Sequence, residues 1–361
     1  MDNKNPTIQQ IALAAGISPS TVSRVINNYA GVTEKTRRKV QSFIDFYNYQ
    51  PNVAAQSLNN KSTKTLSVFF PYEFLQIDDI FSTDNVICHK QVKAISTAAT
   101  ERGYRLLASI ISEPSNPEQQ DMIRRTFRSG MVDGGIFVDF DEPSLIVEEM
   151  AKDGYIVGVL NHEPEKNFGN GHIVFCITDR EIGMYAVSYL YGLGHRKIAV
   201  IGGPERKYSS KQRCYGILQA MKDFNIESVW FERVELSARA TYDCLLNKLQ
   251  RTQEDNFPTA IICGSDTIAF GAIEALKKAN LIVPEDVSVI GMDNHILCTM
   301  IKPALTTFDV DTSLILLDLT TAVIDCIENN FDSPVRKQYR FSFIERDSCC
   351  PPKKTGRVQN A

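Results

Sequence analysis

The stretch TIQQIALAAGISPSTVSRVINN, residues 7–28, has the pattern of two short helices joined by a tight turn. Thr7 is expected to cap the first helix, and Gln10 three residues later completes a capping box. Gly16 stands where that helix must end, because glycine readily takes the left-handed conformation of a helix C-terminus. Ser18 predicts a second N-cap. The segment is therefore expected to form a helix-turn-helix.

The second helix of this motif separates apolar from polar side chains. Val22, Val25 and Ile26 recur at helical spacing and predict its buried face. Pro19 opens the helix at a position where a missing N–H costs nothing. The exposed face is left with small hydroxyls and one arginine, which are Ser20, Thr21 and Arg24. This layout is typical of a recognition helix that lies in the major groove of DNA.

The charge of the chain is divided unevenly along its length. Residues 1–64 contain eight basic and three acidic side chains, a net charge of +5. Because the whole chain carries −4, the remaining residues carry −9. A basic head on an acidic body concentrates the attraction for phosphates in one part of the molecule. This distribution agrees with a DNA-binding role for the helix-turn-helix.

The composition is ordinary for a globular chain. A length of 361 residues, with 43% hydrophobic and 23% charged side chains, predicts two or three domains. No apolar run approaches the roughly 20 residues of a membrane span, and the N-terminus has no apolar stretch of the signal-peptide type. The nine cysteines include no CxxC pair, which favours reduced thiols over disulfides or zinc. We therefore expect a cytoplasmic protein without a metal or other cofactor.

Two further segments belong to the N-terminal region. A third helix is expected over residues 33–47, capped by Thr33, with a buried stripe at Val40, Phe43, Ile44 and Tyr47. Residues 50–61 follow as a linker in which a short helix of about two turns is marginal in water. We expect this linker to become helical only when something holds it.

From Leu66 onward, apolar strand patterns alternate with amphipathic helices. The expected strands are Leu66–Phe70, Leu106–Ile110, Gly135–Val138, Ile156–Leu160, Ile198–Ile201, Val229–Val234, Thr259–Cys263 and Val287–Gly291. Continuous apolar strands between helices indicate parallel sheets covered on both faces. Their number favours two doubly wound lobes over one sheet. Ligands of such folds bind where the carboxyl ends of the strands meet a crevice.

These patterns predict the following organisation. Residues 1–49 form the small all-α helix-turn-helix domain, 50–61 the hinge, 62–346 the two-lobed α/β body and 347–361 a C-terminal tail. Within the body, the N-lobe is expected at about 62–161 and 293–322, and the C-lobe at about 162–292 and 323–346.

Several strings of residues resemble those of one known family. They are AGISPSTVSRVIN (15–27), YQPN (49–52), Leu58, VDGGI (132–136), LGHRKIAVIGG (193–203), PEDVSVIG (284–291) and PALTT (303–307). In this order they resemble the lactose/galactose-repressor (LacI/GalR) family of bacterial transcription regulators over nearly the whole chain. The resemblance implies a periplasmic-binding-protein-like body, a homodimer that reads a near-palindromic operator, and a cytoplasmic, nucleoid-associated location.

The resemblance also assigns roles to residues of the head. Ser20 and Arg24 fall where the family reads base edges, and Arg24 suits guanine because arginine donates two hydrogen bonds to O6 and N7. Pro19 offers no side-chain donor or acceptor, so shape and apolar readout are expected there. The positions where the family mostly holds phosphates are Thr7, Ser18, Thr21, Ser23 and Asn27.

The linker resembles the hinge helix of the family, from Asn52 to Leu58. Leu58 is the candidate for the apolar wedge that opens the minor groove at the central base step, and Ala55 is expected close to the DNA. Effector binding would change the angle between the lobes and with it the spacing of the two hinges.

The expected effector site is less well defined. Arg213 and Asp266 match the effector-binding arginine and aspartate of the family, and a charged pair across a crevice suits sugar hydroxyls. Asp139 and Asn161, each after a strand, are weaker candidates that also suit helix caps. The wall at 71–90 departs from the family string Asn-Pro-Phe-Phe; Tyr72, Phe74 or Phe81 are candidates to replace its rings. His162 and His172 are expected at the surface and not at a metal.

The function predicted from these features is repression of carbohydrate-utilisation genes, controlled by a sugar or sugar phosphate. The main alternative keeps the DNA-binding role but replaces the small effector with a protein corepressor. A sugar-binding transport component is more remote, because the basic head argues against it. No P-loop, GxSxG or HExxH motif is present, so an enzyme is not expected.

Overall fold

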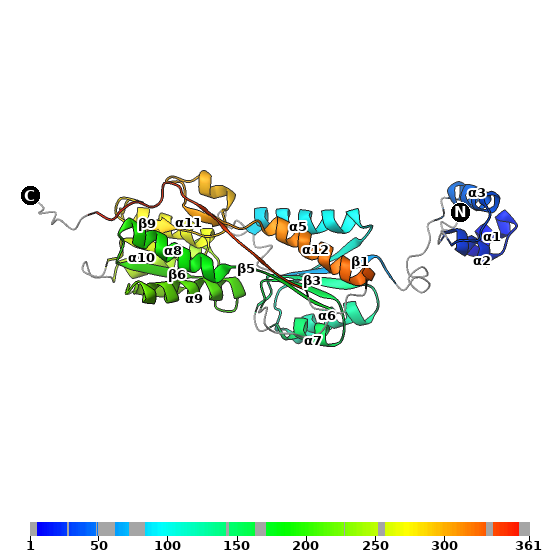
Figure 1. The fold of residues 1–361 in the computed structure, drawn as a ribbon, viewed down its shortest axis with the longest axis horizontal. Coiled ribbons are helices and arrows are strands. Elements are labelled where there is room, and N and C mark those ends of the chain that lie inside the picture. The colour runs from blue at the N-terminus through cyan, green and yellow to red at the C-terminus, as the bar shows by residue number, and fades with distance from the viewer. Residues whose placement is uncertain are drawn as a thin grey trace, which may run out of the picture. The chain divides into compact units, whose positions relative to one another are not determined.

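The computed structural model describes residues 6–26, 29–47, 49, 62–71, 84–141, 144–162, 171–226, 228–251, 257–329 and 335–353, with the backbone alone for 84–88. The chain divides into two compact units, Met1–Thr63 and Lys64–Ala361 (Figure 1). Some of the predicted site residues lie outside the described residues: Asn27, Asn52, Ala55, Leu58, Tyr72 and Phe81.

Among the described residues of the first unit, the helices are α1 (Ile8–Ala15), α2 (Pro19–Ile26) and α3 (Glu34–Phe46). Their buried faces form one small core of Ile11, Ala12, Val22, Val25, Val40 and Tyr49. The predicted buried stripe of the third helix is wrong at Tyr47, which is 43% exposed. The helix ends at Phe46, so the chain turns and Tyr49 fills the core instead.

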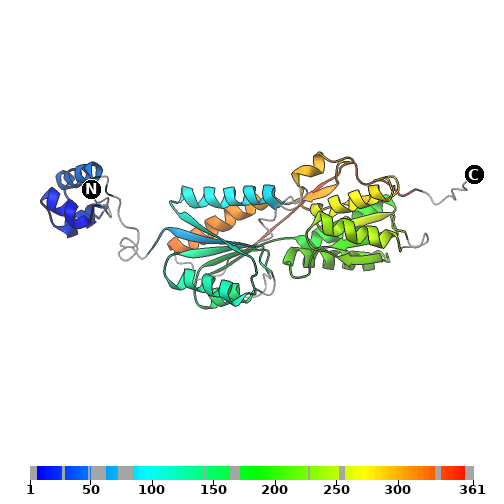
Figure 2. The same ribbon diagram turned by 180° about the vertical axis from the view of Figure 1, so that it is seen from behind.

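The second unit begins with a six-stranded sheet in the order β11-β5-β4-β3-β1-β2. All its pairs are parallel. The strands are β1 (Thr65–Pro71), β2 (Arg105–Ile111), β3 (Gly134–Val138), β4 (Val157–Leu160), β5 (His172–Ile177) and β11 (Val335–Tyr339). Helices cover both of its faces, as Figures 1 and 2 show. They are α5 (Asp84–Glu101) with α12 (Thr312–Asn329), and α6 (Pro117–Arg128) with α7 (Leu145–Lys152).

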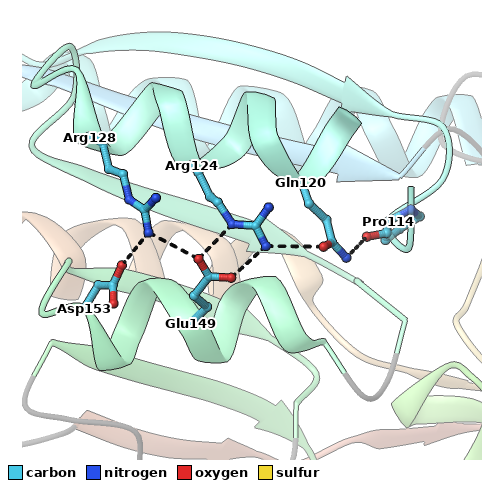
Figure 3. Close-up of polar contacts among 6 residues, drawn as sticks. All are labelled: Pro114, Gln120, Arg124, Arg128, Glu149 and Asp153. Carbon is cyan, nitrogen blue, oxygen red and sulfur yellow. Dashed lines mark hydrogen bonds and ion pairs between the residues drawn. The ribbon is translucent and has the colours of Figure 1, made fainter. Parts of the chain in front are cut away.

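Ion pairs join α6 to α7 across the outer face of this lobe (Figure 3). The guanidinium of Arg124 donates from Nε and Nη2 to the two carboxylate oxygens of Glu149, both at 2.7 Å. Arg128 donates to Asp153 at 3.0 Å, and Gln120 accepts from Arg124 at 3.4 Å. The hydrogen bonds from Arg124 hold the pKa of Glu149 below its usual range; burial opposes this shift, and the charges of Arg124 and Arg128 add to it.

A second sheet of four parallel strands has the order β7-β6-β8-β9. The strands are β6 (Ile198–Gly202), β7 (Ser228–Arg233), β8 (Ala260–Cys263) and β9 (Ser288–Ile290). Its helices are α8 (Asp179–Leu193), α9 (Tyr208–Asp223), α10 (Ala238–Leu249) and α11 (Asp266–Lys278). Strand side chains alternate between two cores: Val200 packs with the α8–α9 side, and Ile201 with the α10–α11 side. Both faces are therefore covered, as the doubly wound pattern predicts.

The predicted lobe boundaries differ from the observed sheets. Strands β5 and β11 and the whole of α12 belong to the first lobe, although the prediction placed 172–177 and 323–346 in the second. Strands β10 (Thr307–Asp309) and β12 (Ser342–Ile344) form a separate small antiparallel pair. The cause is that the chain crosses between lobes later than the sequence pattern suggested.

The start of the predicted tail is also corrected. Ser348 is fully buried, and its hydroxyl donates to the carbonyl oxygen of Val289 at 2.6 Å. The carbonyl oxygen of Cys350 lies 2.9 Å from Nε2 of His195. Residues 347–350 therefore lie along the edge of the second sheet next to β9 and belong to the folded body, not to a tail.

Candidate nucleic-acid interface and effector site

The turn of the helix-turn-helix is held by the caps that the sequence predicted. The hydroxyl of Thr7 accepts from the amide of Gln10 at 3.3 Å, and the Gln10 side chain accepts from the amide of Thr7 at 2.7 Å. Gly16 takes a φ of 61° and its amide donates back to the carbonyls of Ala12 and Leu13. A side chain at Gly16 would be strained in this left-handed conformation.

The start of α2 presents a cluster of hydroxyls. The Ser18 hydroxyl accepts from the Thr21 amide at 3.2 Å, so Ser18 caps the helix as predicted. The same oxygen lies 2.8 Å from the hydroxyls of Ser20 and Thr21. Such a cluster offers both donors and acceptors to phosphate oxygens or base edges.

The outer face of α2 carries the predicted base-reading residues. Val22 and Val25 are buried, which turns Ser20 and Arg24 outward, and both are exposed. Pro19 is exposed as well, while Thr21 and Ser23 are half-buried. Arg24 is exposed, and within the described residues its guanidinium forms no ion pair.

The predicted effector residues lie at the carboxyl ends of the parallel strands. Asp139 directly follows β3, Asn161 follows β4, and Asp266 comes three residues after β8. Asp139 and Asn161 have positive φ angles of 51° and 60°, as residues often do where a strand ends in a tight turn. Arg213 is on α9, the helix after β6. The resulting cluster, the interlobe site, comprises Asp139, Asp141, Asn161, Asp179, Arg206, Lys207, Arg213 and Asp293.

Two basic residues ahead of α9 bridge the lobes. Lys207 is buried, and its Nζ donates to the carbonyl oxygen of Asp139 at 2.9 Å and lies 2.8 Å from a carboxylate oxygen of Asp141. Arg206 lies 3.1 Å from the other Asp141 oxygen and forms a bidentate pair with Glu235. These contacts join the end of β3 in the first lobe to the second lobe.

Arg213 is the most fully engaged side chain of the interlobe site. Its Nε donates to Asp179 at 2.7 Å, its Nη1 to the carbonyl oxygen of Gly264 at 2.8 Å, and its Nη2 lies 2.8 Å from Asp293. Burial alone lowers the pKa of Arg213, but the Asp293 and Asp179 carboxylates more than offset this and raise it. The guanidinium is therefore a fixed positive centre shared by two carboxylates.

Asp266 does not meet Arg213 as the predicted charged pair. Its carboxylate is buried and accepts from the Thr307 hydroxyl at 2.6 Å, the His295 amide at 2.7 Å and the Cys298 thiol at 3.1 Å. Burial, with the charge of nearby Asp293, raises the pKa of Asp266 to about 7. The place expected for Asp266 beside the arginine is taken by Asp293, which follows β9.

Sequence reasoning missed Asp179, Lys207 and Asp293. The rule that found Asp139 and Asn161, a polar residue after the carboxyl end of a strand, also applies to Asp293 and would have found it. Asp179 was hidden because β5 itself was not predicted. Lys207 gave no signal, since an isolated lysine before a helix is usually solvated.

Two histidines of this region are buried, contrary to the expectation that both lie at the surface. His162 and His172 are 1% and 0% exposed, with ring centroids 6.0 Å apart, so the prediction of surface histidines is wrong. Burial lowers the pKa of His172 to about 4, and the charges of His162 and Arg336 act in the same direction. The residues that the structure describes contain no group of three or more potential metal ligands.

A separate shallow hollow lies on the outer face of α8 and α9. Its volume is about 300 Å³, and it is lined by Arg180, Tyr215, Leu218, Gln219 and Lys222. None of the predicted effector residues lines it. Within the described chain, no helix is long and apolar enough to cross a membrane.

Comparison with known proteins gives a family match within each unit. Residues 7–52 match the model of the bacterial regulatory proteins of the lacI family, and residues 187–349 match that of a periplasmic binding protein-like domain. The fold is similar to that of the Lac repressor dimer bound to operator and the anti-inducer ONPF. That comparison has a TM-score of 0.81 at 24% identity and covers 96% of this chain and 100% of the other.

Two curated relatives are similar to this chain over most of its length. The HTH-type transcriptional regulator DegA of Bacillus subtilis (strain 168) is 32% identical over 304 residues, 83% of this chain and 85% of DegA. The HTH-type transcriptional repressor PurR of Vibrio vulnificus (strain CMCP6) is 29% identical over 314 residues, 83% of this chain and 86% of PurR. These relatives are transcription regulators, not enzymes. The chain thus belongs to the lacI family of bacterial regulatory proteins and is a DNA-binding transcription regulator.

Proposed function

We propose that this chain is a homodimeric repressor whose affinity for a near-palindromic operator is set by a small hydroxyl-rich effector. The exposed face of α2 carries the proposal: Ser20 and Arg24 point away from a core that holds Val22 and Val25. In a dimer, two such helices would read successive half-sites in the major groove.

The contacts of the head divide into two kinds. Arg24 and Ser20 are proposed to read base edges. Pro19 is proposed to contact the bases through shape and apolar packing. The hydroxyls proposed to hold the register on phosphates are those of Thr7, Ser18, Thr21 and Ser23, together with the amide of Asn27.

The hinge is proposed to transmit the state of the body. Leu58 would wedge into the minor groove at the operator centre, with Ala55 against the DNA and Asn52 at the start of the hinge. A short helix of this kind is marginal alone, so its formation would depend on the spacing that the two bodies impose.

The interlobe site is proposed to bind the effector. Arg213 and Asp293 form a rigid donor and acceptor pair, which suits adjacent hydroxyls of a sugar. Asp139 and Asn161 would contact the ligand from the first lobe, while Tyr72 and Phe81 are candidates for an aromatic wall. Asp266 would act on the ligand indirectly, because hydrogen bonds within the second lobe already occupy its carboxylate.

A DNA-binding experiment tests the central part of this proposal. Fluorescence anisotropy of the full chain on the DNA upstream of its own gene should show tight, salt-dependent binding to one palindromic site. Arg24→Ala should cost about 1–3 kcal/mol at one base position of each half-site. Arg38→Ala is the matched control, because Arg38 is an exposed arginine of α3 paired with Glu34. Binding without preference for any site would contradict an operator-specific role.

A further inference from the structure

The first lobe offers the interlobe site a row of hydrogen-bond acceptors. Strands β3, β4 and β5 are neighbours in the sheet, and their carboxyl ends lead into Asp139, Asn161 and Asp179. Asn161 is only 8% exposed, and its Oδ1 has no hydrogen-bond donor within the described residues. The same holds for Oδ2 of Asp179, which is 1% exposed. Buried acceptors of this kind require a donor, and none of the described residues donates to these two oxygens.

The basic side chains of the site are less exposed to solvent than two of the carboxylates that pair with them. The side chains of Lys207 and Arg213 are 3% and 7% exposed, whereas those of Asp139 and Asp293 are 35% and 30% exposed. A molecule entering between the lobes therefore meets carboxylate oxygens first. Each basic group already lies on acceptors of its own, which are Asp139, Asp141, Asp179 and Asp293.

The charges of these described residues do not balance. Arg206 is paired with its bidentate partner Glu235, so the two are left out of the count. The remaining groups are the four carboxylates of Asp139, Asp141, Asp179 and Asp293 around the basic side chains of Lys207 and Arg213. Carboxylates near one another at low dielectric repel further negative charge strongly. An anionic ligand would have to compete with these carboxylates for Lys207 and Arg213.

We propose that the effector carries no phosphate or carboxylate and is a neutral or amine-bearing polyol, whose donors satisfy the acceptors of Asn161, Asp179, Asp139 and Asp293. This inference rests on the proposed function, since it assigns a chemical class to the effector of that site. A hydroxyl or an ammonium group donates to these oxygens, whereas a phosphate ester brings charge of the wrong sign.

Occupation of the site also has a consequence for the lobes. Lys207 joins the backbone carbonyl of Asp139 and the carboxylate of Asp141 directly, and the Asp139 carboxylate lies 3.9 Å from its Nζ, so a ligand on that carboxylate would sit beside this bridge. Binding would then alter the balance between bridged and ligand-filled arrangements of the two lobes, which is the change that the hinges are proposed to sense.

The test uses the full chain and a small-molecule extract of the bacterium that carries it, separated by ion exchange into cationic, neutral and anionic pools. Thermal unfolding reports binding to the body, and operator anisotropy reports the response of the head. We expect the neutral or the cationic pool alone to raise the Tm and to change operator affinity about 5–150-fold. Activity in the anionic pool, or in no pool, overturns the proposal.

Two variants test whether the response to the active pool depends on the interlobe site. Asp293→Asn should weaken the response to the active pool about tenfold or more, since it removes a charge-assisted acceptor. Asp243→Asn, which neutralises an exposed aspartate of α10, is the matched control and should leave the response unchanged. A response that Asp293→Asn strengthens would also overturn the proposal. Because the Tm readout needs no DNA, failure of operator binding, which contradicts the proposed function, is distinguished from failure of this inference.

Discussion

The guanidinium of Arg213 and the carboxylate of Asp293 meet at 2.8 Å, and this contact joins α9 to the segment after β9. A second contact of the same guanidinium, 2.7 Å to Asp179, reaches the first residue of α8. Three segments far apart in the chain thus share one buried charge. The arginine holds the interlobe site together and positions Asp293, which is a proposed acceptor for the ligand.

Arg213→Ala should therefore cost both stability and effector response. Removing the arginine leaves Asp179 and Asp293 without their shared partner, for which a loss of about 3–5 kcal/mol in the free energy of unfolding is expected. Urea unfolding of the full chain measures it. Arg206→Ala removes a more exposed arginine nearby and should cost about 1 kcal/mol or less. Equal losses in the two variants would contradict a structural role for the Arg213 pairs.

Lys207→Met tests the bridge between the lobes. Methionine keeps much of the buried side-chain volume but removes the donors to Asp139 and Asp141. Hydrogen exchange should become faster at residues 139–141 and 204–207, because their mutual contacts are lost. Lys211→Met on α9 is the control and should leave both segments unchanged. If exchange at these segments is the same in both variants, the bridge does not hold the lobes.

Asp266 predicts an unusual dependence of stability on pH. Its pKa rises from 3.8 to about 7 on folding, because burial and the charge of Asp293 disfavour the carboxylate. The folded chain therefore binds more protons at this group than the unfolded chain does between about pH 4 and pH 7. Its contribution is complete below pH 4 and is lost as the pH rises toward 7.

Asp266→Asn isolates that contribution. The amide resembles the protonated acid, and the Thr307 hydroxyl can reverse its hydrogen bond to accept from it. Relative to this variant, the free energy of unfolding of the parent chain should fall between pH 4 and pH 7. Denaturant titrations across this range measure the difference, and a difference that rises with pH would contradict the assignment.

The sequence predicted the fold well where local chemistry decides the structure. The caps at Thr7 and Ser18 and the turn at Gly16 depend on neighbouring residues alone, so their pattern was sufficient. Strand β11 was missed because VRKQY is a largely exposed edge strand without an apolar pattern. Strand β5, HIVFCI, does have an apolar pattern and could have been found; without it the lobe boundary was misplaced.

The interlobe site was harder to predict because its partners are distant in sequence. Arg213 was identified, but its choice of Asp179 and Asp293 over Asp266 depends on how three loops converge. The carboxylate of Asp266 accepts from the His295 amide and the Thr307 hydroxyl instead of pairing with Arg213. Both donors are distant in sequence, so the residues around Asp266 do not predict these contacts. Residue types alone could therefore place carboxylates near the site without showing which one faces the arginine.

The close packing of α8 on α9 gives a prediction with an internal control. A Cβ at Gly216 would collide with the carbonyl oxygen of Arg180 on the neighbouring helix. Gly216→Ala should lower the free energy of unfolding by about 1–3 kcal/mol. Gly192→Ala on α8 meets no atom within 4 Å and should stabilise slightly, since alanine favours a helix over glycine. Urea unfolding that gives the same sign for both variants would contradict this packing.

Leu58→Ala tests the proposed wedge of the hinge. An apolar side chain inserted between base steps stabilises only the bent, specific complex, so its removal should weaken operator binding much more than binding to unrelated DNA. The head without the wedge would still contact phosphates at its proposed positions, and phosphate contacts supply most non-specific affinity. Leu13→Ala is a matched control, because Leu13 is an 84% exposed leucine of α1 outside the proposed DNA contacts. Anisotropy titrations on operator and scrambled DNA at one salt concentration measure both affinities. Equal losses on the two DNAs would reject the wedge, and an unchanged operator affinity would show that Leu58 takes no part in recognition.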